Sequence, residues 1–345
     1  MSPQHARPFS RRQFLGGLTL AGTAGLLGLP SGQAAAELPP ETTRLRLTWL
    51  RSICRAPQYV AEELLYSEGF TEVHYLQAGG EGRQTRSLLA SGQVDLSMQF
   101  VGPSLLEVDA GNPISLVAGV QIGCWELFGT DQVQTIRDLK GKAVAADGPG
   151  DSRYTFLASM LAYVGMDPRT DITWVTPPGD PGGAEAKQLF VEGKVDAFLA
   201  TPPLAQELRA QQIGHVVVNS ITDRPWSQYF CCLIAGNREF IQTHPVATKR
   251  ALRAILKAAD VCANAPERAA QLLVDKGYTA NYASALQALR EIPYGQWREY
   301  DSEDTVRFYA LRLHEVGMIK SSPQKIIAQG TDWRFLHALK KELKG

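Results

Sequence analysis

The sequence predicts an α/β protein built as two similar lobes. From residue 44 onward, short apolar strands alternate with helical segments, a pattern typical of βαβ units. Residues 89–95 (Leu-Ala-Ser-Gly-Gln-Val-Asp) are echoed by residues 190–196 (Phe-Val-Glu-Gly-Lys-Val-Asp). Each copy follows a Gly-Gly turn and a helix, and precedes a strand that leads into a Pro-started helix. A spacing of about 100 residues is far longer than solenoid periods, so the repeat indicates two lobes.

The first unit begins with apolar residues that alternate with polar ones over residues 45–49, which predicts a strand. Pro57 opens a helix that runs to about Glu68 and is closed by Gly69, since Pro is tolerated in the first turn and Gly beyond the last. The pattern then predicts a strand, a helix and a strand over residues 72–75, 83–90 and 94–99.

The second unit opens at residues 136–142 and continues as a strand over 143–146 and a helix over about 152–164. A strand near 215–219 follows, and residues 223–230 have no helical period, so we expect a crossover there. From Asn237 the chain is predicted to be helical, with Pro266 starting one of the helices.

The N-terminus has the composition of an export signal. Arg11-Arg12 and Phe14-Leu15 precede an uncharged stretch rich in Gly and Leu over residues 16–29, and residues 34–36 are Ala-Ala-Ala. A basic start, a short apolar middle and a small-residue end predict a cleaved signal peptide over residues 1–36, of the twin-arginine type. The alternative is an ordinary N-terminal helix or tail. With no Cys near the cleavage site, we expect a free periplasmic protein without a lipid anchor.

Charge and cysteine content narrow the function further. Removing residues 1–36 removes three of 35 basic residues and none of 35 acidic ones, which leaves a net charge of about −3. Such a charge predicts no nucleic-acid partner, and we expect a monomer. Adjacent Cys231 and Cys232 lie in an apolar run, where side chains of a strand point to opposite faces, so buried thiols are favoured over a redox or metal pair. Sequence assigns no disulfide among the five cysteines, Cys54, Cys124, Cys231, Cys232 and Cys262.

With these features the chain resembles the periplasmic binding proteins for nitrate, sulfonate, taurine and thiamine-precursor-like ligands. The resemblance rests on Leu-Arg-Leu-Thr-Trp-Leu at 45–50, Ala-Pro-Gln-Tyr-Val-Ala at 56–61 and Asp-Leu-Lys-Gly-Lys at 138–142, together with the two Gly-x-Val-Asp segments and residues 229–256. It implies the type II binding-protein fold, in which two α/β lobes joined by two crossover strands enclose a ligand cleft. Lobe 1 would comprise residues 44–130 and 223–300, lobe 2 residues 131–222, with C-terminal helices over 301–345.

The resemblance implies a solute-binding component of an ABC importer. Such a protein captures a small organic anion (a sulfonate, nitrate, a taurine-like compound, or an aromatic or heterocyclic compound) and delivers it to permease subunits in the inner membrane. We expect no catalysis, no cofactor and no metal.

Ligands of open α/β sheets bind beyond the carboxyl ends of strands, near helix N-termini. Residues that follow predicted strands or lie on the crossovers are therefore candidates for ligand binding. Arginine suits an anion, and Trp or Phe suits an apolar body. Core packing is the alternative for Trp49 and Phe100, and a solvated helix turn for Arg153, whereas Asp151 is predicted to cap a helix. The candidates are Trp49, Arg51, Ser52, Gln99, Phe100, Trp125, Ser152, Arg153, Thr201 and Tyr229.

The rival function is enzymatic. The chain contains no P-loop, G-x-G-x-x-G, G-x-S-x-G or H-E-x-x-H pattern. An exported enzyme or redox protein on the same fold, similar to pyrimidine synthases or bearing a cofactor, remains the alternative because twin-arginine export often serves cofactor-bearing proteins. A bound chromophore or metal would favour it.

Overall fold

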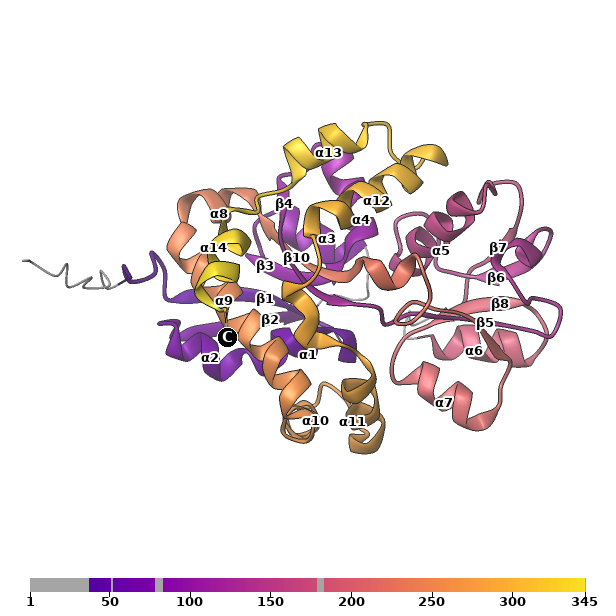
Figure 1. Ribbon diagram of the computed structural model, residues 1–345, viewed down its shortest axis with the longest axis horizontal. Helices are drawn as coiled ribbons and strands as arrows, with labels where there is room; N and C mark the ends of the chain where they lie inside the picture. Colours follow the sequence, from indigo (N-terminus) through magenta and orange to yellow (C-terminus); the bar gives the residue numbers. More distant parts are fainter. Residues whose placement is uncertain (1–36, 51, 78–82, 179–182, 345) are drawn as a thin grey trace, which may run out of the picture. The chain divides into compact units, whose positions relative to one another are not determined.

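The computed structural model describes residues 37–50, 52–77, 83–178 and 183–344 (Figure 1). The predicted signal peptide and the candidate Arg51 lie outside the described residues. Within them, the strands form two five-stranded mixed sheets with helices around each, so the predicted α/β class is confirmed.

The first sheet has the strand order β2-β1-β3-β10-β4. Strand β1 pairs in parallel with β2 and β3, whereas β10 runs antiparallel between β3 and β4. The strands are β1 (Arg44–Trp49), β2 (Glu72–Gln77), β3 (Leu96–Phe100), β4 (Ile114–Ile122) and β10 (Phe230–Asn237).

The second sheet has the order β7-β6-β8-β5-β9, which is the same topology. Its β6 pairs in parallel with β7 and β8, and β5 runs antiparallel between β8 and β9. The strands are β5 (Glu126–Gly129), β6 (Ala143–Ala145), β7 (Thr173–Val175), β8 (Ala197–Ala200) and β9 (His215–Asn219).

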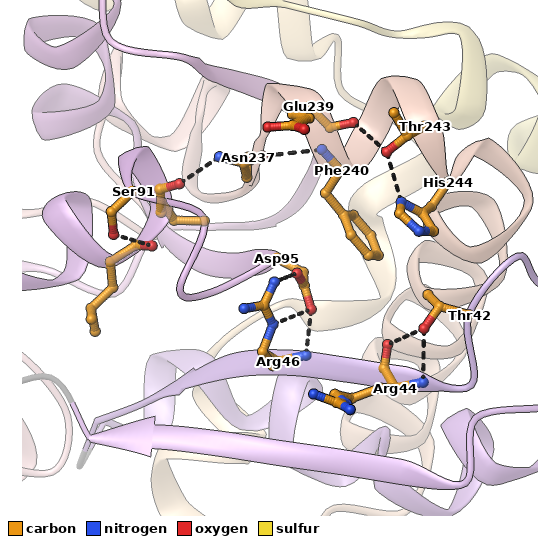
Figure 2. A network of polar contacts seen from close by, with 12 residues as sticks. Thr42, Arg44, Arg46, Ser91, Asp95, Asn237, Glu239, Phe240, Thr243 and His244 are labelled. Carbon is orange, nitrogen blue, oxygen red and sulfur yellow. Dashed lines mark hydrogen bonds and ion pairs between the residues drawn. The ribbon is translucent and has the colours of Figure 1, made fainter.

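The aspartates that end the two Gly-x-Val-Asp segments have the same role in the two sheets. The buried Asp95 carboxylate accepts the backbone N–H of Arg46 at 2.7 Å and pairs with its guanidinium at 2.5 Å (Figure 2). Asp196 accepts the backbone N–H of Ala143 at 2.9 Å. Each carboxylate thus fastens the strand that follows it to the parallel strand beside it, β3 to β1 and β8 to β6, which explains why the repeat ends in Asp.

The chain passes from one sheet to the other twice. Strand β4 belongs to the first sheet and β5 to the second, and β9 belongs to the second and β10 to the first. Each sheet therefore receives its antiparallel strand directly after a crossing. Both crossings lie beside the candidate site described below.

Helices cover both sheets, and those from the C-terminal part pack on the first sheet and on α4 and α5 (Figure 1). The predicted helix over residues 57–68 is divided into α1 and α2 at Ala61, whose N–H approaches the carbonyls of Pro57 and Tyr59. The α-helices are α1 (Ala56–Val60), α2 (Glu62–Ser67), α3 (Arg83–Ala90), α4 (Val101–Asp109), α5 (Ser152–Tyr163), α6 (Ala184–Val191), α7 (Leu204–Gln211), α8 (Arg238–Thr243), α9 (Pro245–Asn264), α10 (Pro266–Asp275), α11 (Tyr282–Glu291), α12 (Ser302–Glu315), α13 (Pro323–Gly330) and α14 (Arg334–Glu342). Short 3-10 helices comprise Ile53–Arg55, Ile136–Leu139, Trp226–Gln228 and Tyr294–Arg298. None of the helices in the described part of the chain is long and apolar enough to span a bilayer.

A second polar network joins β10 to α3 and α8. Asn237 donates its side-chain N–H to the carbonyl of Leu89 at 2.9 Å and accepts the N–H of Phe240 at 3.0 Å (Figure 2). It therefore caps α8 while fixing the end of α3. The hydrogen bond to Leu89 connects the end of β10 with α3, as expected if segments from both ends of the chain build the first sheet.

The expectation that Cys231 and Cys232 point to opposite faces of a strand is wrong. Their sulfur atoms lie 4.0 Å apart because β10 is irregular where it pairs with β4: Phe230 pairs with Ile122 but Cys232 pairs with Gln121. Such a β-bulge breaks the strict alternation of side chains. Both thiols are buried, as predicted.

Candidate functional site

Two helix N-termini meet where the elements of the two sheets adjoin. Helix α4 follows β3 directly, with Phe100 at its N-cap, and α5 begins at Ser152 with Asp151 at its N-cap. A Cβ atom placed on Gly102 of α4 would lie 2.7 Å from the Thr155 hydroxyl of α5. Only a residue without a side chain permits this approach. The positive ends of two helix dipoles are thereby brought together in a buried place.

The Asp151 side chain accepts the backbone N–H groups of Arg153 and Tyr154, at 2.7 and 3.3 Å. The prediction that Asp151 caps a helix is confirmed. This cap fixes the start of α5. It uses only the backbone N–H of Arg153, so the guanidinium is available for other contacts.

Aromatic rings from separate parts of the chain surround the meeting point. Phe100 packs edge-to-face against Phe156 of α5 and Tyr309 of α12, with centroids 5.3 Å apart in each pair. Trp125, in the crossing between β4 and β5, lies 6.3 Å from Phe100 and 5.9 Å from Phe156. We call these four residues, Phe100, Trp125, Phe156 and Tyr309, the aromatic cluster. Phe100 follows a strand of the first sheet, whereas Phe156 lies on α5, which follows a strand of the second sheet. The cluster therefore joins the elements around one sheet to those around the other.

The indole of Trp125 is 2% exposed, and its N–H has no hydrogen-bond partner among the described residues. A buried donor without a partner costs about 1–3 kcal/mol, so such groups usually have a role in binding or are satisfied by solvent. The Arg153 guanidinium lies 5.8 Å from the centroid of the Trp125 ring, within the range of a cation–π interaction.

Arg153 itself is only 5% exposed, which excludes the alternative of a solvated residue on a helix turn. Its guanidinium lies 3.6 Å from the Asp147 carboxylate, which follows β6. The Asp147 carboxylate neutralises part of the positive charge of Arg153. An arginine held this deeply next to two helix N-termini creates a positive local potential, and an anion would be attracted to it.

A cavity of about 10 Å³ adjoins the Arg153 side chain. It is lined by residues at the carboxyl end of β6 and at the start of α6, namely Ala145, Ala146, Asp147, Arg153, Pro177, Gly183 and Ala186. This is room for about one water molecule. A ligand of several atoms therefore requires the surrounding groups to separate, as in hinge opening.

Glu126 follows Trp125 directly and is 2% exposed. Burial raises the pKa of its carboxyl, although Arg209, whose guanidinium lies 3.5 Å away, acts to lower it.

Arg86 of α3 joins α4 to the loop that precedes α5. It is 5% exposed, donates to the carbonyl of Gly150 in the loop before α5, and donates to Glu107 of α4 at 2.8 Å. The contact orients the loop that carries Asp151 relative to α4.

Of the predicted site residues, Phe100, Trp125, Ser152 and Arg153 are brought together at the meeting point of α4 and α5. Gln99 is close by in β3, and its amide donates to Ser104 of α4 at 2.7 Å. Thr201 lies half-buried just beyond β8, and Ser52 lies half-buried before the first 3-10 helix.

Two predicted aromatic residues have other main partners. Trp49 is half-buried, and its ring lies 6.4 Å from that of Tyr278. Tyr229 stacks on Phe308 of α12 at 4.0 Å and lies 6.3 Å from Tyr309, so it touches only the edge of the aromatic cluster.

Sequence reasoning missed Phe156, Tyr309, Arg86 and Asp147. Phe156 lies one helical turn after Ser152, and this spacing was a usable signal. Tyr309 has no such signal, because α12 reaches the site only through its packing on α4 and α5.

A family model described as "NMT1-like family" matches residues 38–274, more than half of the chain. The chain belongs to the NMT1-like family. No curated protein matches it in sequence.

Solved structures of low sequence identity share the fold. The periplasmic nitrate-binding protein NrtA from Synechocystis PCC 6803 has a TM-score of 0.72 and 16% identity, covering 89% of this chain and 90% of that one. The alkanesulfonate-binding protein SsuA from Xanthomonas axonopodis pv. citri, bound to MOPS, has a TM-score of 0.65 and 18% identity, covering 85% and 99%. A cysteine-to-serine mutant of DSZB in complex with biphenyl-2-sulfinic acid has a TM-score of 0.56 and 16% identity, covering 87% and 99%. The fold is therefore that of the periplasmic binding proteins.

Proposed function

We propose that the chain is the solute-binding component of an ABC importer and that it captures a small organic anion at the meeting point of α4 and α5. In this proposal the protein works in the periplasm after twin-arginine export and delivers its ligand to permease subunits of the inner membrane. The elements of the first sheet would act as one lobe and those of the second sheet as the other, with the second lobe beginning at β5 (Glu126–Gly129) and not at residue 131. Ligand contacts to both lobes would favour closure.

The observation that carries the proposal is the buried Arg153 beside Trp125. A guanidinium that is 5% exposed, at the start of a helix and 5.8 Å from an indole ring, provides charge and a flat apolar surface in one place. The Trp125 N–H adds a donor that has no partner among the described side chains and main chain. Together these groups suit a sulfonate or carboxylate head.

The aromatic cluster favours organic anions that carry an aromatic or alkyl group. The Trp125 ring lies beside the Arg153 guanidinium, and Phe100 and Phe156 pack against Trp125, so these rings offer faces and edges that pack well against an aromatic or alkyl body. An organic anion with such a body is therefore preferred over bare nitrate. Two of the similar structures support this class, since one is an alkanesulfonate binder with MOPS and the other a complex with an aromatic sulfinic acid, whereas the nitrate binder supports only the anionic charge of the ligand.

The test is a thermal-shift screen of the purified protein against nitrate, taurine, methanesulfonate, benzenesulfonate, benzoate and a pyrimidine, followed by calorimetry. A ligand at about 100 times its Kd stabilises the native state by about 2.7 kcal/mol, which raises Tm by roughly 4 °C for a chain of this length. The products are analysed in parallel, because chemical turnover of the hit would support the enzymatic alternative instead.

Variants locate the binding site. Arg153→Gln should weaken binding of the hit by at least about 30-fold, roughly 2 kcal/mol, because a buried charged partner is lost. Trp125→Phe keeps a ring and removes the N–H, and should cost about 1 kcal/mol, or fivefold. Arg169→Gln is the matched control, since Arg169 is exposed and pairs with Asp167 of its own loop. Equal affinities for wild type, Arg153→Gln and Ser152→Ala would show that this site is not where the ligand binds.

A further inference from the structure

Three buried cysteines outside the proposed ligand site converge at the crossings between the sheets. The sulfur atoms of Cys124, Cys231 and Cys232 all lie within 4.8 Å of one another. Cys124 and Cys231 are 2.9 Å apart, and Cys231 and Cys232 are 4.0 Å apart. Their residues are 2–4% exposed. We call these three residues the thiol cluster.

The cluster depends on a backbone irregularity. In a regular strand Cys231 and Cys232 would point away from each other, but the bulge in β10 turns both sulfurs toward Cys124. Bulges re-aim side chains and are common next to functional sites. Two thiols placed on the same side by a bulge, opposite a third from a distant segment, form a set of converging donors.

A fourth thiol and a cation adjoin the cluster. The Cys54 thiol is also buried and acts to raise the pKa of the Cys124 thiol, but its sulfur is not among the three that lie within 4.8 Å of one another. The guanidinium of the buried Arg55 acts on Cys232 with its positive charge. A buried positive charge offsets part of the negative charge that several thiolates would carry when they bind a metal.

The geometry matches a thiophilic metal ion. Metal–sulfur bonds of about 2.3 Å place neighbouring thiolate sulfurs roughly 3.8–4.0 Å apart in a three- or four-sulfur site. The distance between Cys231 and Cys232 already has this value, and Cys124 needs to move by about 1 Å from Cys231. Thiolate ligands without carboxylate or imidazole select Cu(I) and Zn(II) over hard cations.

We propose that Cys124, Cys231 and Cys232 bind one thiophilic d10 cation, Cu(I) in a three-sulfur site or Zn(II) if Cys54 supplies a fourth sulfur. Because Cys124 lies on the crossing from β4 to β5 and the other two lie at the start of β10, the ion joins both crossings. It therefore braces the two connections between the sheets. The proposal does not depend on the identity of the organic ligand.

The test uses the full chain, purified and reduced under anaerobic conditions. Metal content is measured as isolated, and the protein is then titrated with Cu(I) and with Zn(II) against chromophoric chelators, both in the native state and during refolding, since the thiols are buried. We expect one equivalent of Cu(I) or Zn(II) per chain, with thiolate-to-metal charge-transfer absorption. A loss of affinity of at least about 100-fold is expected for Cys124→Ala, Cys231→Ala and Cys232→Ala.

Cys262→Ala is the matched control, because Cys262 is fully buried in α9 and belongs to no such cluster of described residues. Circular dichroism identifies any variant that fails to fold, and the wild-type stoichiometry decides independently of the variants. Cys54→Ala separates the two metals, since it should weaken Zn(II) and leave Cu(I) nearly unchanged.

Three results would overturn the proposal. They are the absence of tight binding by wild type, equal binding by the cluster variants and by Cys262→Ala, and a Cys124–Cys231 disulfide that re-forms after reduction and excludes the metal. Mass spectrometry detects the disulfide as a loss of two hydrogens. Failure of the thermal-shift screen for organic anions would leave these measurements unaffected, so the two proposals can fail separately.

Discussion

Replacing Gly102 tests how closely the two helix N-termini of the candidate site approach. A Cβ atom at this position would lie 2.7 Å from the Thr155 hydroxyl and 2.8 Å from a ring carbon of Phe100. Normal contacts are about 3.5–4.0 Å, so alanine overlaps its neighbours by roughly 0.7 Å. Phe100 is held by the aromatic cluster, and Thr155 donates to the Asp151 carbonyl at 2.8 Å, so neither can retreat without losing contacts.

Overpacking of this kind costs about 1–3 kcal/mol. The entropy of unfolding is about 2.1 cal/mol/K per residue, or roughly 0.6 kcal/mol/K for about 300 residues. Gly102→Ala should therefore lower Tm by about 1.5–5 °C, and Gly102→Val should lower it further. Since the two helices must separate, the affinity for the organic anion should fall as well.

The assay is chemical denaturation and calorimetric melting of wild type and the two variants. Gly295→Ala is the control, because a Cβ there would meet its nearest neighbour, the Cβ of Ala263, at 3.3 Å. That contact is tight but tolerable, and we expect little change. An unchanged midpoint for Gly102→Ala, or equal shifts for both glycines, would refute the close approach of α4 and α5.

Two further predictions concern the links between α9 and the beginning of the described chain. Glu41 accepts the N–H groups of Val246 and Ala247 at 2.9 and 2.8 Å; burial acts to raise the pKa of its carboxyl, but these backbone hydrogen bonds outweigh it and lower the pKa. Glu41→Gln should therefore cost about 1 kcal/mol at neutral pH, and the difference from wild type should vanish as pH falls through the lowered pKa, as measured by urea unfolding at several pH values. Equal losses at all pH values would contradict this. The second link is the buried, bidentate ion pair of Arg253 with Glu68, where one contact is 2.8 Å. Arg253 also pairs with Glu342 at 2.7 Å, so Glu68→Gln weakens the compensation of its charge without removing it. A loss of about 2 kcal/mol that is insensitive to added salt is expected, and a loss that disappears in salt would mean that the pair is effectively exposed.

Much of the fold was predictable because it depends on local patterns. The alternation of strands and helices, the two Gly-x-Val-Asp units and the crossover near residue 223 all follow from periodicity and turn residues. The helix over residues 83–90 has the predicted bounds, and the helix predicted from Ser152 ends within one residue of its predicted end. Asp151 was identified as a cap from its position before that helix. Such features are decided within a few residues.

The candidate site was predictable only in part. The rule that ligands bind beyond strand ends identified Phe100, Ser152 and Arg153, and the position of Trp125 on a crossover identified that residue. The same two criteria also selected Trp49, Ser52, Thr201 and Tyr229, because they indicate which end of a sheet binds ligands but not which loops come together there. Tyr309 of α12 completes the aromatic cluster from far beyond Phe156 in the chain, and no local pattern signals that contact.

Local sequence patterns were enough to predict the class of fold, the repeated units and the residue types available at the ends of the strands, since each is a property of neighbouring residues. Tertiary structure alone decided which of those residues meet, how deeply Arg153 is buried, and that Cys231 and Cys232 face the same way. A bulge appears only when a strand pairs with its partner, and burial depends on what packs on top. Both are consequences of long-range packing, so the thiol cluster and the surroundings of Arg153 emerge only in the folded chain.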